Sequence, residues 1–160
     1  MSLYARVLSK IDIDEIMEFE QKKLEISIPD EMERSIHSWN VRWRKESLEH
    51  FAPLGWSYML REESKDGVEG ALVGYFIAQP LLFFDGQTQS LWVEHLQFNN
   101  MQICDELLDL AYRLSRDKHF QKVYIPKPIS EMKRFAELKG PSLKMNKWQP
   151  EITEIKTTKV

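Results

Sequence analysis

Apolar residues recur with helical spacing in four stretches of the chain. The first begins at Asp12, which can cap a helix while Glu15 reaches back, and the apolar residues that follow lie on one side. The third and fourth stretches cover 103–114 and 130–139. In the second, the apolar residues are spaced by four, three and four, at Met32, Ile36, Trp39 and Trp43. The pattern therefore predicts four helices.

Strand-like runs occupy much of the remaining chain, at 4–8, 56–62, 71–84, 91–98, 122–125, 143–148 and 152–157. The run 71–84 is apolar on both faces, which is typical of a central strand with helices on either side. Pro80 predicts a bend or bulge within it, and Asp85-Gly86 predicts a tight reversal into the next run.

The order of these elements predicts the fold class. A strand, a helix and a strand follow one another from 91 to 125, which predicts a right-handed crossover between parallel strands. The expected class is α/β (α+β), with a mixed, mostly antiparallel sheet flanked by helices. The expected order is β-α-α-β-β-β-α-β-α-β-β.

Length and composition limit the function classes. The 160 residues suit one domain, 1–160. The pI near 5.9 and the lack of a basic stripe interleaved with aromatics argue against nucleic-acid binding. The histidines are scattered without ligand spacing, so no metal site is predicted. No run approaches the roughly 20 apolar residues of a membrane span. A single cysteine, Cys104, and no visible signal peptide lead us to expect a cytoplasmic location and no membrane partner.

Three segments resemble the GNAT superfamily of N-acetyltransferases. Strand 72–78 with its hairpin at 85–86 resembles the central antiparallel strands of that family. The segment 96–98 leading into 103–108 resembles the junction that holds coenzyme A, and 123–125 followed by a helix closing at 138–140 resembles the part after it. The resemblance implies acetyl-CoA or another acyl-CoA as cofactor and a small-molecule or peptidic amine as acyl acceptor.

The resemblance assigns the cofactor to one continuous segment. Backbone groups of the strand would pair with the pantetheine arm, and the free N–H groups of the helix start, capped by Asn99-Asn100, would meet the phosphates. The expected cofactor-binding residues are Leu96, Gln97, Phe98, Asn99, Asn100, Met101, Gln102, Ile103 and Cys104.

The chain departs from the family pattern at two places. The phosphate loop of the family reads Gln or Arg, two residues, Gly, one residue, then Gly or Ala. Here Asn99, Gln102 and Cys104 fall on those positions, and no glycine lies between Gly86 and Gly140. The tyrosine that protonates the leaving thiol in the family falls on Ala136.

Glu94 and His95 are the candidate catalytic bases, since an acceptor amine must lose a proton before or during attack. Strand alternation predicts that their side chains point to opposite faces, so one at most would serve. The alternatives are a surface carboxylate and a half-buried, hydrogen-bonded histidine. Trp39 and Trp43 would line the acceptor pocket, or else form part of the core. Cys104 is either a nucleophile at a helix start or a packing residue.

Three functional hypotheses remain open from the sequence. The first is a divergent GNAT-type, acyl-CoA-dependent N-acyltransferase. The second is a catalytically silent GNAT-like module that binds a ligand or partner, and the third is an unrelated α+β domain. The last strands also allow a homodimer formed by edge pairing. A splay between strand 91–98 and strand 122–125 would favour the first two hypotheses.

Overall fold

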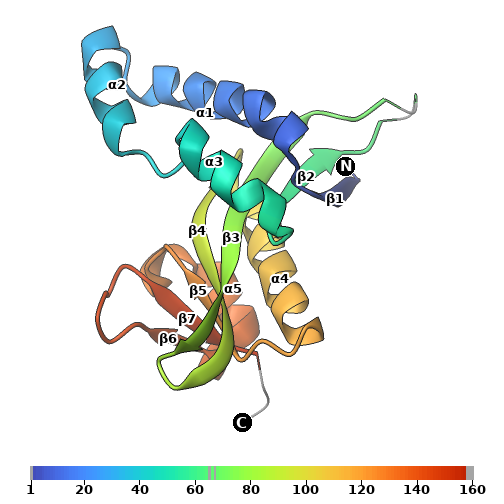
Figure 1. The fold of residues 1–160 in the computed structure, drawn as a ribbon, viewed down its shortest axis with the longest axis vertical. Coiled ribbons are helices and arrows are strands. Elements are labelled where there is room, and N and C mark those ends of the chain that lie inside the picture. The colour runs from blue at the N-terminus through green and yellow to red at the C-terminus, as the bar shows by residue number, and fades with distance from the viewer. Residues whose placement is uncertain (1, 65, 67, 158–160) are drawn as a thin grey trace.

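The computed structural model describes residues 2–64, 66 and 68–157. Residues 65 and 67, within the loop expected at 64–70, lie outside the described residues. The strands are β1 Leu3–Val7, β2 Tyr58–Glu62, β3 Leu72–Phe84, β4 Gln87–Phe98, β5 Lys122–Ile125, β6 Leu143–Met145 and β7 Thr153–Lys156. The α-helices are α1 Ile13–Ser27, α2 Glu31–His37, α3 Lys45–Phe51, α4 Met101–Asp117 and α5 Lys133–Lys139 (Figure 1).

The strands form one seven-stranded sheet in the order β1-β2-β3-β4-β5-β7-β6. β1 to β4 are antiparallel neighbours, β4 and β5 run parallel across α4, and β7 is antiparallel to both β5 and β6. The predicted class, a mixed and mostly antiparallel sheet flanked by helices, is confirmed. β1 and β6 form the edges of the sheet, and the expected edge-to-edge homodimer stays a prediction.

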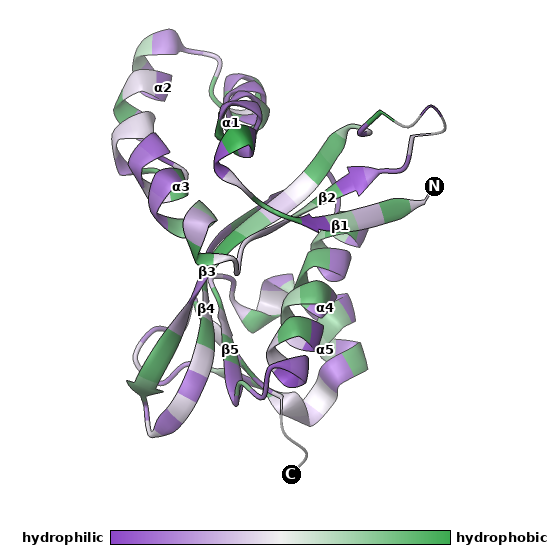
Figure 2. Ribbon diagram, turned by 45° about the vertical axis from the view of Figure 1, so that its right-hand side comes forward, coloured by the Kyte–Doolittle hydropathy of each residue, from purple (hydrophilic) through white to green (hydrophobic). Residues whose placement is uncertain are grey.

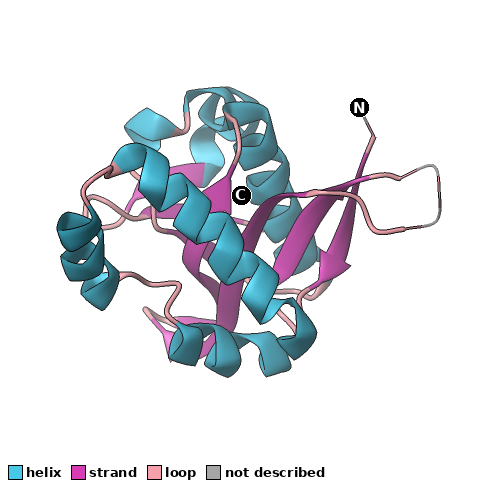
Figure 3. Ribbon diagram, turned by 90° about the horizontal axis from the view of Figure 1, so that it is seen from above, coloured by secondary structure: helices cyan, strands magenta, loops and turns pink. Residues whose placement is uncertain are grey.

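The helices cover the two faces of the sheet, as Figures 2 and 3 show. On one face α1 and α3 pack on the side chains of Tyr75 and Ile77. On the other face α4 and α5 pack on Phe76 and Ala78. Gly74 lets the start of α4 approach β3, because a Cβ there would lie 2.7 Å from the Ile103 side chain. The central strand is therefore covered on both sides, as its apolar run predicted.

The prediction of a single second helix is wrong, because the structure has two short helices there. α2 ends in a 3₁₀ turn, Val41 is extended, and α3 starts afresh after Arg44. The break turns Trp43 into the protein, where it is 6% exposed, whereas Trp39 is 68% exposed. Packing of Trp43 therefore overrides the helical spacing of the apolar residues.

The start of α1 also differs from the prediction. A 3₁₀ turn precedes the helix, and the Asp12 carboxylate accepts from the Ser9 N–H at 2.9 Å and pairs with Arg6 at 2.8 Å. Glu15 pairs with the buried guanidinium of Arg61 instead of capping the helix. A buried cation needs a counter-ion more than a helix start needs a second cap.

The bulge in the β3–β4 pairing lies in β4, opposite Ile77 and Ala78, and Pro80 pairs with Leu91 without a break in register. β2 accompanies β3 only as far as Phe76, so Pro80 has no strand on that side. The missing N–H of proline therefore costs no inter-strand hydrogen bond on that side of β3.

Local turns make two elements, β6 and α5, shorter than predicted. β6 ends at Met145 because the Asn146 side chain accepts from the N–H groups of Trp148 and Gln149, which turns the chain. α5 starts at Lys133, after a separate 3₁₀ turn at Ile129–Glu131, and ends at Gly140 with φ +43°. Among the described residues, no helix has the length and apolar character needed to cross a membrane.

Candidate active site

A β-bulge in β4 positions the two candidate bases. Ile77 pairs with His95 and Ala78 with Val93, so Glu94 is the extra residue of the bulge. Val93 and Leu96 both face the core beneath α4, which leaves Glu94 and His95 together on the other side, and both line one cavity. The prediction that they point to opposite faces is therefore wrong, because the bulge interrupts strand alternation.

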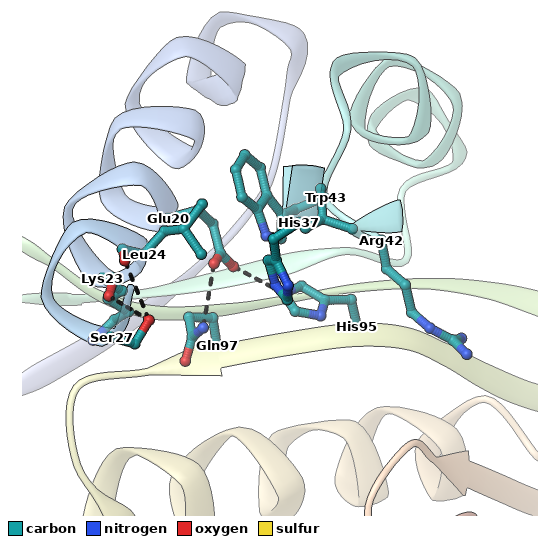
Figure 4. A pocket seen from close by; sticks show the side chains of 10 residues that line it. Glu20, Lys23, Leu24, Ser27, His37, Arg42, Trp43, His95 and Gln97 are labelled. Carbon is teal, nitrogen blue, oxygen red and sulfur yellow. Dashed lines mark hydrogen bonds and ion pairs between the residues drawn. The ribbon is translucent and has the colours of Figure 1, made fainter. Parts of the chain in front are cut away.

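A buried carboxylate, Glu20 of α1, organises the site (Figure 4). Glu20 is 3% exposed. Its Oε1 accepts from the Tyr75 hydroxyl at 2.6 Å and lies 2.8 Å from His95 Nε2, and its Oε2 accepts from the Gln97 amide at 3.2 Å. Burial, and then the Glu20 charge, raise the pKa of Tyr75 well above its usual value, so Tyr75 remains a hydroxyl donor. Donation from Nε2 to Glu20 leaves His95 Nδ1 with the ring lone pair.

The Glu20 cluster forms part of the wall of a cavity of about 270 Å³, hereafter the acceptor cavity after the amine acceptor expected beside Trp43. Its other lining residues include Lys23, His37, Arg42 and Trp43. The Lys23 ammonium donates to Asn99 Oδ1 at 2.9 Å. Burial lowers the pKa of Lys23, and the nearby Glu20 charge opposes that shift.

A second cavity of about 340 Å³ lies between β4 and the segments that follow β5 and precede β7. Glu94, Leu96 and Lys127 contribute to its lining. Arg42 and His95 line both this cavity and the acceptor cavity, so the two adjoin at these residues. Glu94 accepts from Trp92 Nε1 at 2.8 Å and from Arg42 at 3.2 Å. His95 thus borders both cavities.

β4 and β5 separate beyond a short paired stretch. They pair at only three positions, from Ser90 to Trp92, and then β5 ends while β4 continues to Phe98. Among the described residues, the edge of β4 from Glu94 to Phe98 therefore has no strand partner on the β5 side. The splay expected between the two strands stays a prediction.

No protein-family model matches the chain, and no curated protein matches it in sequence. Solved structures do match. A PaiA N-acetyltransferase from Thermoplasma acidophilum, crystallised with coenzyme A, superposes with TM-score 0.64 at 18% identity, covering 98% of this chain and 99% of that one. An acetyltransferase of the GNAT family from Listeria monocytogenes gives 0.58 at 11% identity, covering 96% and 92%. A polyamine N-acetyltransferase from Drosophila melanogaster gives 0.58 at 12% identity, covering 96% and 98%.

The chain has the GNAT N-acetyltransferase fold. The third hypothesis, an unrelated α+β domain, is thereby wrong. At these identities the likeness concerns the fold, and the function has to be argued from the site.

The expected cofactor segment of this GNAT fold divides into accessible and buried parts. Asn100 caps α4, since its Oδ1 accepts from the Ile103 N–H at 3.0 Å. Met101 and Gln102 are exposed, and their N–H groups have no intrahelical acceptor. Leu96, Ile103 and Cys104 belong to the core. Burial raises the pKa of Cys104 to about 11, which contradicts its role as a nucleophile.

These residues fit the amide-rich pantetheine arm of coenzyme A better than its phosphates. The open edge of β4 suits an amide-rich arm, which needs backbone groups and no particular side chain. At the helix start, the Cys104 side chain points into the core, so only Gln102 crowds the position of a loop glycine. Phe98 is half-buried, and the ammonium of Lys127, two residues after the end of β5, lies 5.1 Å from its ring centroid.

The structure brings His95, Glu94, Gln97 and Trp43 to the two cavities, and it leaves Trp39 at an outer hollow beside Trp43. The sequence reasoning missed Glu20, Tyr75, Lys23, His37 and Arg42. A signal for Glu20 existed, because it lies between Ile16 and Leu24 on the buried face of α1, where a lone carboxylate requires a partner.

Proposed function

We propose that this protein is an acyl-CoA-dependent N-acyltransferase that acts on a small or peptidic amine. The observation that carries the proposal is the contact of buried Glu20 with His95, at the point where the acceptor cavity adjoins the open edge of β4. A base oriented by a carboxylate, beside a strand edge suited to an amide-rich cofactor, is what amine acylation needs. The coenzyme A bound to the Thermoplasma protein and the polyamine specificity named for the Drosophila enzyme support the same reaction class.

In this scheme the acceptor amine lies in the acceptor cavity, and acyl-CoA supplies an acyl thioester from the β4 edge. His95 takes a proton from the amine, directly or through one water, and Glu20 stabilises the resulting imidazolium. The new C–N bond replaces the C–S bond, and the thiolate leaves. Ala136 offers no proton to the thiolate, so we assign its proton to the His95 imidazolium or to solvent.

Glu94 is the alternative base. It accepts a hydrogen bond from Trp92 on one carboxylate oxygen and from Arg42 on the other, so both oxygens are already engaged. We therefore assign proton transfer to His95 and give Glu94 the role of holding Arg42 at the junction of the two cavities.

The test is release of free thiol from acetyl-CoA in the presence of a panel of small amines and N-terminal peptides. His95→Gln should lower kcat by about 10²–10⁴-fold. His50→Gln is the matched control, because His50 is an exposed histidine of α3 that lines neither cavity. No amine-dependent thiol release by the wild-type protein would contradict the proposal.

A second candidate, the catalytically silent GNAT-like module, is favoured by Gln102 at a glycine position and by Ala136 at the tyrosine position. Under this hypothesis acetyl-CoA or an amine binds, but no thiol is released. Binding without turnover, unchanged by His95→Gln, would support it over the enzyme.

A further inference from the structure

The acceptor cavity contains a lysine, Lys23, that forms no ion pair among the described residues. Lys23 is half-buried in its wall, and its ammonium has two neutral partners, the Asn99 side-chain oxygen at 2.9 Å and the Phe19 ring, whose centroid is 4.9 Å away. No Asp or Glu of the described residues forms an ion pair with it. By contrast, Lys22, the next residue of α1, pairs with Glu18 at 3.0 Å on the exposed face of the helix. A partly dehydrated ammonium of this kind is favoured by an anion that enters the cavity.

The nearby carboxylate, Glu20, lies three residues before Lys23 on α1 and is already engaged. Glu20 is buried, and Tyr75, His95 and Gln97 already occupy its two oxygens. It is the only carboxylate among the described lining residues of this cavity. The other carboxylate near His95, Glu94, is engaged by Trp92 and Arg42.

These charges discriminate between classes of amine. A di- or polyamine would place its second ammonium near Lys23 with no free carboxylate to receive it, and like charges at close range repel. An amine that also carries an anion would place the amine at His95 and the anion at Lys23. In Figure 4 the labelled Lys23 and Arg42 lie on opposite sides of Glu20 and His95, and Arg42 is paired with Glu94, so Lys23 is the cation left for an anion.

We propose that the acceptor is a small amine that also carries an anionic group, a carboxylate or a phosphate, and that Lys23 is the specificity-determining residue that binds this anion. The inference rests on the proposed function in assigning the amine to His95. Binding of the anion at Lys23 does not depend on turnover.

Two matched ligand pairs test this directly, each differing in one anionic group: L-leucine against 3-methylbutylamine, and phosphoethanolamine against ethanolamine. Binding is measured by calorimetry, and acetyl transfer by thiol release. At least one anionic member should be preferred by tenfold or more in Kd and in kcat/KM. The pair that shows the preference identifies the anion as carboxylate or phosphate.

Variants of adjacent lysines provide the control. Lys23→Met should abolish the preference, Lys23→Arg should retain most of it, and Lys22→Met should leave it unchanged. Equal or tighter binding of the plain amines would overturn the proposal, as would no binding of either anionic ligand at millimolar concentration. A Lys23→Met effect confined to KM for acetyl-CoA would also overturn it, because Lys23 would then serve the cofactor. Lys23-dependent binding of an anionic amine without thiol release would instead contradict the proposed enzyme and support this inference.

Discussion

The two halves of the candidate site are built in different ways. The acceptor half depends on side chains, because Glu20 binds Tyr75, His95 and Gln97 from three positions on two strands. The cofactor half depends on the backbone, through the open edge of β4 and the helix start at Met101. Side-chain chemistry requires particular residues at particular places, whereas backbone binding tolerates substitution. Under the proposed function, the absence of glycine at the helix start would therefore weaken cofactor binding without removing the β4 edge, its main binding surface.

The largest effect is expected when Glu20, the centre of the acceptor half, is replaced. Glu20→Leu leaves the buried Tyr75 hydroxyl without its acceptor and His95 without its orienting partner. We expect a loss of about 1–3 kcal/mol in the free energy of unfolding, measured by urea titration. We also expect a fall of about 10²-fold or more in kcat.

Glu20→Gln separates these two effects. The glutamine retains an oxygen for Tyr75 but lacks the charge that stabilises an imidazolium, so stability should recover more than kcat does. Equal recovery of both would contradict the electrostatic role of Glu20.

A smaller effect, on the affinity for coenzyme A, is expected at the helix start of the cofactor half. Gln102 is exposed at the second position of α4, where the GNAT loop has a glycine. Gln102→Gly should tighten coenzyme A binding about tenfold, which is roughly 1.4 kcal/mol, because it opens access to the helix N–H groups. Calorimetry with coenzyme A measures this change.

Gln102→Ala is the control for this effect, because it removes the side chain without adding the flexibility of glycine. It should give part of the gain in coenzyme A affinity. No gain in either variant would mean that the helix start does not contact the phosphates.

The smallest effect concerns a buried tyrosine beyond both cavities. Burial raises the pKa of Tyr124 from 10.0 to about 12. Between pH 10 and 12 the unfolded chain ionises this tyrosine while the folded protein does not, so rising pH favours unfolding. Tyr124→Phe removes this contribution and should reduce the loss of stability between pH 8 and 11 by about 1 kcal/mol. Urea unfolding of both proteins at the two pH values measures it, and an identical loss in the two would contradict the assignment.

The fold was more predictable from the sequence than the site. The long apolar run of β3, the amphipathic α4 and the short β5 each carry a strong local pattern, and together they predicted the sheet and its parallel pair. The break between α2 and α3 was not predictable, because it depends on the burial of Trp43 and on the contact between Arg42 and Glu94.

In the site, the sequence proposed His95 and the β4–α4 junction as candidates, but not the residues that surround His95. Glu20 lies 75 positions from His95, and no periodicity links them. No local sequence pattern indicates the bulge at Glu94, since the bulge follows from how β3 and β4 pair along their whole length. Long-range contacts of this kind are set by tertiary packing, which local patterns do not record.

A thermal-shift titration with acetyl-CoA, with free coenzyme A and ATP as controls, tests the central claim that this GNAT fold still binds an acyl-CoA. At about a hundred times the dissociation constant, bound ligand stabilises the folded state by roughly 2.7 kcal/mol. For a domain of this size we expect Tm to rise by about 5–10 °C with acetyl-CoA and coenzyme A, and not with ATP. An unchanged Tm with acetyl-CoA up to millimolar concentration would contradict the account.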